Sequence, residues 1–269
     1  MLLAVEVGNT NVKFGLFELD GAAAGTLVHT WRSATDRHQT GDDLAAHVDA
    51  MLRLNGVNRS SVKRVVIASV VPPLYRALSL MSQRYFGCRP EFLSAVRQSL
   101  VPVKTRRIAE LGADLISGAI GGVAKYGSPL IVVQFGTATT FAAISAAGDY
   151  LGTAIAPGIE VSVDALIRRA AKLMDVPLVK PEAAIGTDTA TALQAGIIFG
   201  YIGQVEYLVS KIRQEMKAPA KAVATGGLAD LITAHTDIFA VTDERLVLDG
   251  LYVWATKSRT KAKQTTPSL

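Results

Sequence analysis

The sequence predicts an α/β protein of two similarly built halves, each with a mixed sheet that opens on a strand meander. Two observations support this prediction. The segments 2–21 and 130–149 share one layout, in which an apolar strand, a polar residue, a glycine turn and a second strand follow one another. Between the strand patterns lie stretches whose apolar residues recur at helical spacing.

Further strand patterns follow the two meanders. A third strand is expected near 25–33 in the first half and near 150–158 in the second. Residues 64–73 form a continuous apolar run that ends in two prolines. Such a run is typical of a strand that is buried on both faces of a sheet.

Helical patterns separate these strands. Residues 41–54 place apolar side chains on one face and begin with two aspartates, which suit the positive end of a helix dipole. The longest helix is expected at 188–216, where many small residues would allow another helix or another subunit to approach closely. Residues 221–230 predict a strand, a glycine turn and a helix start, and a last helix is expected around 248–256.

Composition and charge narrow the function classes. Of the 269 residues, 49% are hydrophobic and 19% are charged, which is enough to bury an ordinary core. Cys88 is the only cysteine, so an intrachain disulfide and a Cys-x-x-Cys zinc site are both excluded. The net charge is +5, the C-terminal tail is basic, and no nucleic-acid-binding motif accompanies it. We therefore expect no nucleic-acid partner.

The repeat and the polar tail divide the chain. We expect an N-terminal lobe at 1–117, a C-terminal lobe at 118–256 and a basic, disordered tail at 257–269. Ligands of open α/β sheets bind where such turns converge, so the cleft between the lobes is the expected ligand position.

Two segments, 129–148 and 191–209, are apolar enough to raise the question of a membrane span. Polar residues interrupt both, so we expect them to be buried core elements. The first apolar stretch lacks a basic leader and contains Glu6, which does not fit a signal peptide. A cytoplasmic location without a membrane partner is therefore expected.

Three glycine turns offer contacts to a nucleotide. The turn at 8–10 presents backbone N–H groups, an amide and a hydroxyl to phosphate oxygens, and the turn at 136–140 presents three hydroxyls. The turn at 225–227 would let a flat base or ribose pass close to the backbone. A single glycine turn of this kind is most simply interpreted as a structural turn. Three such turns in this order along the chain indicate phosphoryl chemistry. The chain has no Walker or dinucleotide-binding motif.

Motif-like stretches run almost from end to end of the chain. They are VGNTNVKFGLF (7–17), WRSATDRHQTGDDL (31–44), ASVVPPL (68–74), LGADLI (111–116), FGTATTF (135–141), GTAIAPGIEVSVDAL (152–166), IGTDTATALQAGIIFGYIGQVE (185–206), ATGGLA (224–229) and LDGLYVWA (248–255). In this order they resemble the actin/sugar-kinase/Hsp70 superfamily and, more closely, the type III pantothenate kinase family, also called Bvg accessory factor-like. The resemblance implies that the two halves are actin-like (ribonuclease H-like) lobes.

The resemblance also implies an activity. Members of this family transfer the γ-phosphate of ATP to pantothenate in coenzyme A biosynthesis, with Mg²⁺ and a monovalent cation, K⁺ or NH₄⁺. They are homodimers with the pantothenate pocket at the subunit interface, which suits the small-residue helix. The expected ATP-binding residues are Gly8, Asn9, Thr10, Lys13, Gly136, Thr137, Thr139, Thr140 and Gly226. The expected substrate-binding residues are Gly112, Ala113, Leu115 and Thr189.

Four charged positions of the family pattern decide the chemistry, and three are altered. Asp114 matches the catalytic base and is retained. Glu6 keeps the charge of the first-turn aspartate but is longer by one methylene, so the expected catalytic residues are Asp114 and Glu6. Leu115 replaces an arginine that holds the anionic substrate. Gln134 replaces the aspartate at the monovalent-cation position, where an uncharged oxygen lowers cation affinity.

Two further positions bear on these changes. Arg106 or Arg107 offers a replacement for the missing arginine, although a pair of arginines before an apolar helix is more often only solvated. Ala142 stands where an acid often follows the Thr-Thr-Phe segment.

Three hypotheses follow. The first is a pantothenate kinase of reduced activity. The second is a catalytically silent paralogue that binds nucleotide, regulates, or pairs with an active homologue as a heteromer. The third is a kinase for another small alcohol that lacks a carboxylate, which the leucine at 115 favours.

Overall fold

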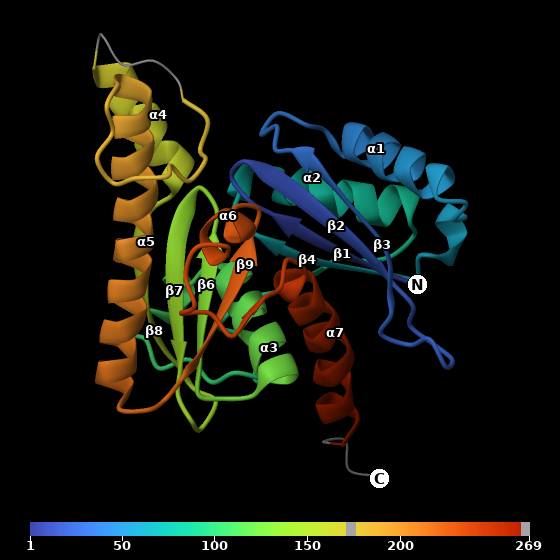
Figure 1. Cartoon of the computed structure of the whole chain (residues 1–269). Coiled ribbons are helices and arrows are strands. Elements are labelled where there is room, and N and C mark those ends of the chain that lie inside the picture. Colours follow the sequence, from blue (N-terminus) through green and yellow to red (C-terminus); the bar gives the residue numbers. More distant parts are fainter. Residues whose placement is uncertain (171–175, 265–269) are drawn as a thin grey trace. The chain divides into compact units, whose positions relative to one another are not determined.

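Two mixed sheets of five strands form the framework of the chain (Figure 1). In this computed structural model, residues 1–170 and 176–264 are described. The chain divides into a first unit, Met1–Lys125 with Leu246–Leu269, and a second unit, Tyr126–Arg245. Each unit contains one of the sheets, so the α/β class with a mixed sheet in each half is confirmed.

The first sheet has β1 (Leu2–Val7) at its centre. Its strand order is β3-β2-β1-β4-β5, with β2 at Asn11–Phe17, β3 at Leu27–Ala34, β4 at Arg64–Ser69 and β5 at Glu91–Phe92. The meander β1-β2-β3 is antiparallel, whereas β1-β4 and β4-β5 are parallel. All six residues of β1 are buried, as expected for a central strand covered on both faces.

One face of this sheet packs against α1 (Gly41–Leu54) and α2 (Tyr75–Leu80). Alternate residues of the strands, such as Val5, share a core with the apolar side of α1. The helix begins at a capping box, in which Thr40 accepts a hydrogen bond from the Asp43 backbone and the Asp43 carboxylate accepts one from Thr40.

The opposite face is covered by α7 (Leu246–Gln264), which packs on β1, β2 and β4 and also contacts α3 (Ala113–Tyr126). The Ser117 hydroxyl donates to the Val247 carbonyl oxygen over 2.7 Å. A Cβ at Gly250 would lie 1.9 Å from the Ser117 carbonyl oxygen, so only glycine permits this close approach of the two helices.

The second sheet repeats the order and strand directions of the first. It runs β10-β9-β6-β7-β8, with β6-β7 and β7-β8 antiparallel and β6-β9 and β9-β10 parallel. The bounds are Leu130–Phe135 for β6, Ala138–Ile144 for β7, Tyr150–Pro157 for β8, Lys221–Gly226 for β9 and Val241–Thr242 for β10. The internal duplication expected from the two meanders is therefore confirmed.

Helix α5 (Thr189–Met216) lies along one face of the second sheet, as Figure 1 shows. One side of it, including Ile198 and Val205, shares a core with the inward-facing residues of β6 and β7. Among the described helices, only α5 is long and apolar enough to cross a membrane by length and composition, and a core helix passes the same test. The short elements α4 and α6 occupy Ile159–Arg169 and Ala229–Thr233.

Four short helical turns complete the described elements. They are η1 (Arg59–Ser61), η2 (Pro72–Leu74), η3 (Met81–Tyr85) and η4 (Ile108–Glu110), and η3 has π-helical hydrogen bonding.

The chain path differs from the expected division at 117/118. That boundary falls inside α3, and the first unit includes α3 up to Lys125. The last helix also belongs to the first unit, since α7 packs on β1, β2 and β4. The division is discontinuous in sequence, which a linear reading of composition does not indicate.

Two elements differ in length from the expected ones. The strand expected at 64–73 ends at Ser69, because the following segment turns into η2 at the two prolines. The helix expected around 248–256 runs from Leu246 to Gln264, so the first part of the basic tail is helical rather than disordered. The last five residues of that tail, 265–269, lie outside the described residues.

Candidate functional site

The first glycine turn joins β1 to β2 and is stabilised by hydrogen bonds within the turn and from Thr35 and Arg37. The Gly8 N–H donates to the Asn11 carbonyl oxygen over 3.0 Å. The Thr35 hydroxyl donates to the Gly8 carbonyl oxygen over 2.7 Å, and Arg37 donates to the Asn9 side-chain oxygen over 3.2 Å. Asn9 and Thr10 are exposed at the tip. Thr35 and Arg37 belong to the motif 31–44, but the sequence alone gave them no role.

Glu6 lies one residue before the end of β1 and is buried, with 6% of its surface exposed. Its Oε2 lies 3.7 Å from the Lys13 Nζ. Burial raises the pKa of the Glu6 carboxyl above its ordinary value of 4.5, and the nearby Asp114 carboxylate raises it further. Lys13 opposes both effects. The first turn therefore carries a desolvated carboxylate that one ammonium group partly neutralises.

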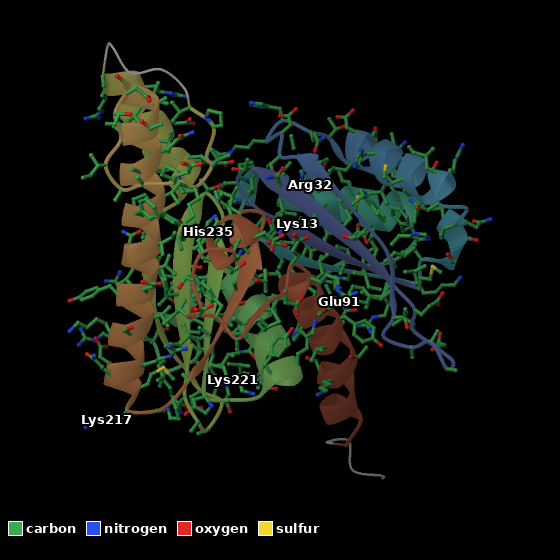
Figure 2. The ribbon with its side chains drawn as sticks, in the orientation of Figure 1. Lys13, Arg32, Glu91, Lys217, Lys221 and His235 are labelled. Carbon is green, nitrogen blue, oxygen red and sulfur yellow. The ribbon has the colours of Figure 1, made fainter. Side chains whose placement is uncertain are left out.

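A row of charged residues crosses the first sheet beside this turn. Glu6 of β1 faces Lys13 of β2, and Lys13 faces Arg32 of β3. Figure 2 labels Lys13 and Arg32, which come from these neighbouring strands. Residues paired in register project from the same side of a sheet, so the row presents one anion and two cations together. This side is the one that α7 covers, because Phe17, four residues further along β2 and therefore on the same side, stacks on Tyr252 at 5.0 Å.

Asp114 lies at the same edge of the first sheet as the turn. The Val70 N–H donates to the Val7 carbonyl oxygen, and Val70 lies against Gly112. A Cβ at Gly112 would lie 2.5 Å from the Asp114 Oδ1, so glycine is needed for the carboxylate to occupy this position. The Leu115 N–H donates to the same Oδ1 over 2.9 Å. The structure thus places Glu6 and Asp114 at one strand edge.

The other predicted residues of this segment have plain structural positions. Ala113 is buried at the start of α3, and Leu115 is half-buried. Arg106 and Arg107 are exposed, and Arg107 pairs with Glu110 at 2.9 Å. The guanidinium of Arg107 is therefore engaged in a surface ion pair.

In the second unit, a row of three uncharged polar residues occupies the position equivalent to Glu6. Gln134 of β6 faces Thr140 of β7 on one side and Thr225 of β9 on the other. The Gln134 Oε1, the Thr140 Oγ1 and the Thr225 Oγ1 are all buried, and none has a hydrogen-bond partner within the described part of the chain. Unpartnered buried oxygens are uncommon in folded proteins, and an ion or water frequently accounts for them.

The second glycine turn presents fewer hydroxyls than expected. Gly136 and Thr137 are exposed at its tip. Thr139, however, is fully buried, and its hydroxyl shares a hydrogen bond with the Tyr201 hydroxyl of α5. Its side chain therefore faces the packed side of the sheet. Thr140 faces the other side, in the row with Gln134.

Gly226 ends β9 and has a steric reason to be glycine. Its φ is +104°, which an L side chain rarely adopts. A Cβ there would lie 2.2 Å from the Phe135 carbonyl oxygen of the neighbouring strand. The residue is thus required for the close approach of β9 to β6, whether or not a base or ribose passes over it.

Thr189 is the first residue of α5 and is exposed. It lines a cavity of about 490 Å³ together with Gly186, Asp188 and Leu193. Asp188 caps the helix, since its carboxylate accepts a hydrogen bond from the Thr191 N–H over 2.9 Å. This bond lowers the pKa of the Asp188 carboxyl.

The residues present fit one of the two expected metals better than the other. Mg²⁺ usually takes one or two carboxylates together with substrate phosphates and waters, and Glu6 with Asp114 offers two carboxylates. Among the described residues, no three His, Cys, Asp or Glu side chains group as a metal site. The row of Gln134, Thr140 and Thr225 offers a monovalent cation three oxygens but no negative charge.

The family model of type III pantothenate kinases matches residues 2–211. The chain belongs to this family. The match covers the glycine turns at 8–10 and 136–140, Asp114 and most of α5. The turn at 225–227, strands β9 and β10 and helices α6 and α7 lie outside it.

Solved structures of low sequence identity share the fold. A protein from Campylobacter jejuni described as a Baf family transcriptional activator is 20% identical, with a TM-score of 0.59, over 96% of this chain and 99% of that one. The activator of 2-hydroxyisocaproyl-CoA dehydratase from Clostridium difficile is 10% identical, with a TM-score of 0.55, over 100% and 98%. A Sinorhizobium meliloti protein described as a 2-dehydro-3-deoxygalactonokinase is 13% identical, with a TM-score of 0.53, over 100% and 99%. The actin-like α/β class expected from the sequence is confirmed.

The buried carboxyl of Glu6 predicts a pH dependence of stability. Because its pKa is raised in the folded state, the folded protein holds the proton more tightly than the unfolded chain does. The free energy of unfolding should therefore fall as the pH rises from about 4.5 through the raised pKa. In Glu6→Gln the free energy of unfolding should decrease less over this pH range, because the titrating carboxyl is absent. Urea unfolding at a series of pH values is the measurement.

Glu110→Gln is the matched control, because Glu110 is an exposed glutamate of the same unit. It should keep the wild-type slope of unfolding free energy against pH. Equal slopes for wild type and Glu6→Gln would contradict the description of Glu6 as a desolvated carboxyl.

Proposed function

We propose that this chain phosphorylates pantothenate with ATP, more slowly than relatives that keep the aspartate and arginine of the family pattern. The observation that supports the proposal most directly is the placement of two carboxylates, Glu6 and Asp114, beside the first glycine turn of a type III pantothenate kinase family member. In phosphoryl transfer the protein performs little covalent chemistry. It positions the reactants, neutralises the charge on the phosphates and provides a base for the attacking hydroxyl.

In this proposal Asp114 is the base. Its carboxylate is fixed at the start of α3 by the Leu115 N–H and by its close packing on Gly112. A carboxylate in this position can accept the proton of the attacking substrate hydroxyl as the new bond to phosphorus forms. Glu6 and Asp114 are the carboxylates that would hold Mg²⁺, which would neutralise charge on the nucleotide phosphates.

Nucleotide binding is proposed for the exposed parts of the turns. Asn9 and Thr10 offer an amide and a hydroxyl from the first unit, and Lys13 adds a charge behind them. Gly136 and Thr137 offer an exposed main chain and a hydroxyl from the second, although the Gly136 N–H donates to the Ala138 carbonyl oxygen. Thr140 and Gly226 are also proposed to bind the nucleotide. For Thr139 we propose a main-chain contact only, because its hydroxyl forms a hydrogen bond with the Tyr201 hydroxyl.

The reduced rate is proposed from the altered residues. Glu6 reaches further than an aspartate, and misplacement by ~1 Å can cost on the order of 100-fold in rate. Leu115 cannot form a charge-assisted hydrogen bond with the pantothenate carboxylate. The guanidinium of Arg107 forms an ion pair with Glu110. Of the two arginines proposed to replace the missing one, the exposed Arg106 is therefore the better candidate to bind the pantothenate carboxylate.

Two alternatives have their own supporting observations. A silent paralogue would explain the uncharged row at Gln134, and isothermal titration with a non-hydrolysable ATP analogue would exclude its nucleotide-binding form if no heat is detected. A kinase for an alcohol without a carboxylate would explain the half-buried Leu115. A panel of small alcohols assayed for ADP release would count against it if none exceeds the solvent background.

Substrate binding at Thr189 is proposed to involve a second copy of the chain. Gly196, Gly200 and Gly203 are exposed on α5, and apart from the adjoining backbone of α5 no described atom lies within 4 Å of the position of a Cβ at any of them. Tyr207 continues the same stripe and is 63% exposed. A helix with this open, flat side can approach α5 of a second copy closely. In the proposed cytoplasmic homodimer, the second copy covers this side of α5, and no membrane contact is needed to explain its apolar residues.

Gly200→Leu should abolish the dimer by filling this stripe. Sedimentation velocity is expected to give twice the monomer mass for the wild type and the monomer mass for the variant. Ala46→Leu, on the exposed side of α1, is the control and should sediment as the wild type does. A wild type that is monomeric at micromolar concentration, or a dimeric Gly200→Leu, would exclude α5 as the dimer interface.

Restoring the family residues should raise the activity. The triple variant Glu6→Asp, Leu115→Arg and Gln134→Asp is expected to exceed the wild-type kcat/KM for pantothenate by about 100-fold or more. It shortens the carboxylate at position 6, adds a cation for the pantothenate carboxylate and adds an anion for the monovalent cation. Phosphopantothenate formation from ATP, Mg²⁺, NH₄⁺ and pantothenate is the measurement. A triple variant that folds normally and is no faster than the wild type would overturn the proposed cause of the reduced rate.

Gln134→Asp alone should create a dependence on K⁺ or NH₄⁺ that the wild type shows only weakly. The thermal midpoint of the variant is expected to rise when K⁺ replaces tetramethylammonium at equal ionic strength, since a carboxylate then joins the two threonine oxygens. Gln134→Glu is the control for charge without the shorter reach. A wild-type protein that gains as much stability from K⁺ as the aspartate variant would show that the uncharged row already binds the cation well.

A further inference from the structure

A second cavity of about 690 Å³ lies in the first unit, away from the glycine turn. Val62 and Lys63, which line it, come directly before β4, and the Lys63 N–H donates to the carbonyl oxygen of Met1, before β1. Since β1 and β4 run parallel, their starts and their ends lie at opposite edges of the sheet. Glu6 and Gly8 are at the ends, so this cavity is separate from the proposed phosphoryl-transfer site.

Its walls come from three irregular segments. They are the C-terminal end of α1 with the following loop, the turn η1, and the π-helical turn η3 with the residues after it. The turn η3 continues α2 directly, and single π-helical turns of this kind are rare and frequently occur at functional sites. Gly87 follows η3 with a φ of +64°, which turns the chain so that Cys88 joins the lining. The volume is in the range of small-molecule sites.

Positive charge predominates in this lining. Arg53 and Arg59 both pair with Asp49, at 2.7 and 3.8 Å, and Lys63 is a third cation. The Asp49 side chain is only 19% exposed, whereas that of Arg53 is 78% exposed. One carboxylate cannot neutralise three cations, and each guanidinium has five N–H donors, most of which stay available. The carbonyl end of α1 stabilises these cations, and it offsets only part of their positive potential.

The remaining lining is partly apolar. Val57, Tyr85 and Phe86 contribute side chains that are neither fully buried nor fully exposed. A multiply charged anion can therefore place its charge against the guanidinium groups and an apolar part against the aromatic residues. We propose that this cavity is a binding site for a small, multiply charged phosphate-bearing molecule, distinct from the nucleotide position.

Cys88 provides a direct test, because it lines the cavity and is the only cysteine in the chain. Its rate of alkylation can be followed by mass spectrometry with the anionic reagent iodoacetate and the neutral reagent iodoacetamide. Net positive charge around the thiol should favour the anionic reagent. The ratio of the two rates should fall several-fold in Arg59→Gln/Lys63→Gln. Arg76→Gln/Arg97→Gln removes the same charge from other exposed positions of the unit and should keep the wild-type ratio.

Pyrophosphate is the probe for binding. It should slow alkylation of wild-type Cys88 by iodoacetamide several-fold and have no effect on Arg59→Gln/Lys63→Gln. Asn9→Ala/Thr10→Ala, altered at the glycine turn, should keep the protection. Calorimetric titration of the same proteins gives a second readout, in which only the cavity variant should lose a binding event that the turn variant retains.

The opposite results would overturn the proposal. These are equal alkylation ratios in the two charge-neutralised variants, or protection and binding heat that are lost in the turn variant and kept in the cavity variant. No pyrophosphate binding to either position in the wild type would overturn it as well. None of these outcomes depends on turnover of pantothenate, so failure of this site and failure of the proposed kinase activity are distinguishable.

Discussion

The central strand β1 is buried along its whole length, and its last residue but one is a carboxylate. This arrangement constrains the rest of the first unit. A buried Glu6 needs a neighbouring cation, and the antiparallel register with β2 supplies Lys13. The parallel register with β4 brings the Gly112–Asp114 segment to the same edge. A second carboxylate therefore lies close to a group whose ionisation is already unfavourable, which is a common arrangement where phosphates and metals bind.

The second unit repeats the architecture without the charge. Its central strand β6 carries Gln134 where β1 carries Glu6, and the paired positions hold threonines instead of a lysine and an alanine. A glutamine in this place needs no counter-ion, so the fold tolerates it, but it leaves buried oxygens without partners. The duplication thus preserves the strand order in both halves while the electrostatics of the two turns have diverged.

Much of the architecture could be predicted from the sequence, because local patterns specify it. The meanders, α1 and α5 follow from apolar periodicity and capping residues near to one another in the chain. Pairings between distant segments could not be predicted in the same way. The row of Gln134 with Thr225 depends on the parallel pairing of β6 with β9, and the place of α7 depends on its packing against β1. Thr139 was expected at the nucleotide, yet its side chain lies on the helix-packed side of β7.

In the proposed function, the family scaffold is kept and Asp114 acts as the base, while the charges around the transferred phosphate are altered. The central claim is that Asp114 still serves pantothenate phosphorylation. The most direct test is ³¹P NMR of the purified wild type with ATP, Mg²⁺, NH₄⁺ and pantothenate, beside a folded Asp114→Asn variant. The account predicts a slow rise of the phosphopantothenate resonance in the wild type and a rate about 10²–10⁴-fold lower in the variant. No product from the wild type, or equal rates for both proteins, would contradict it.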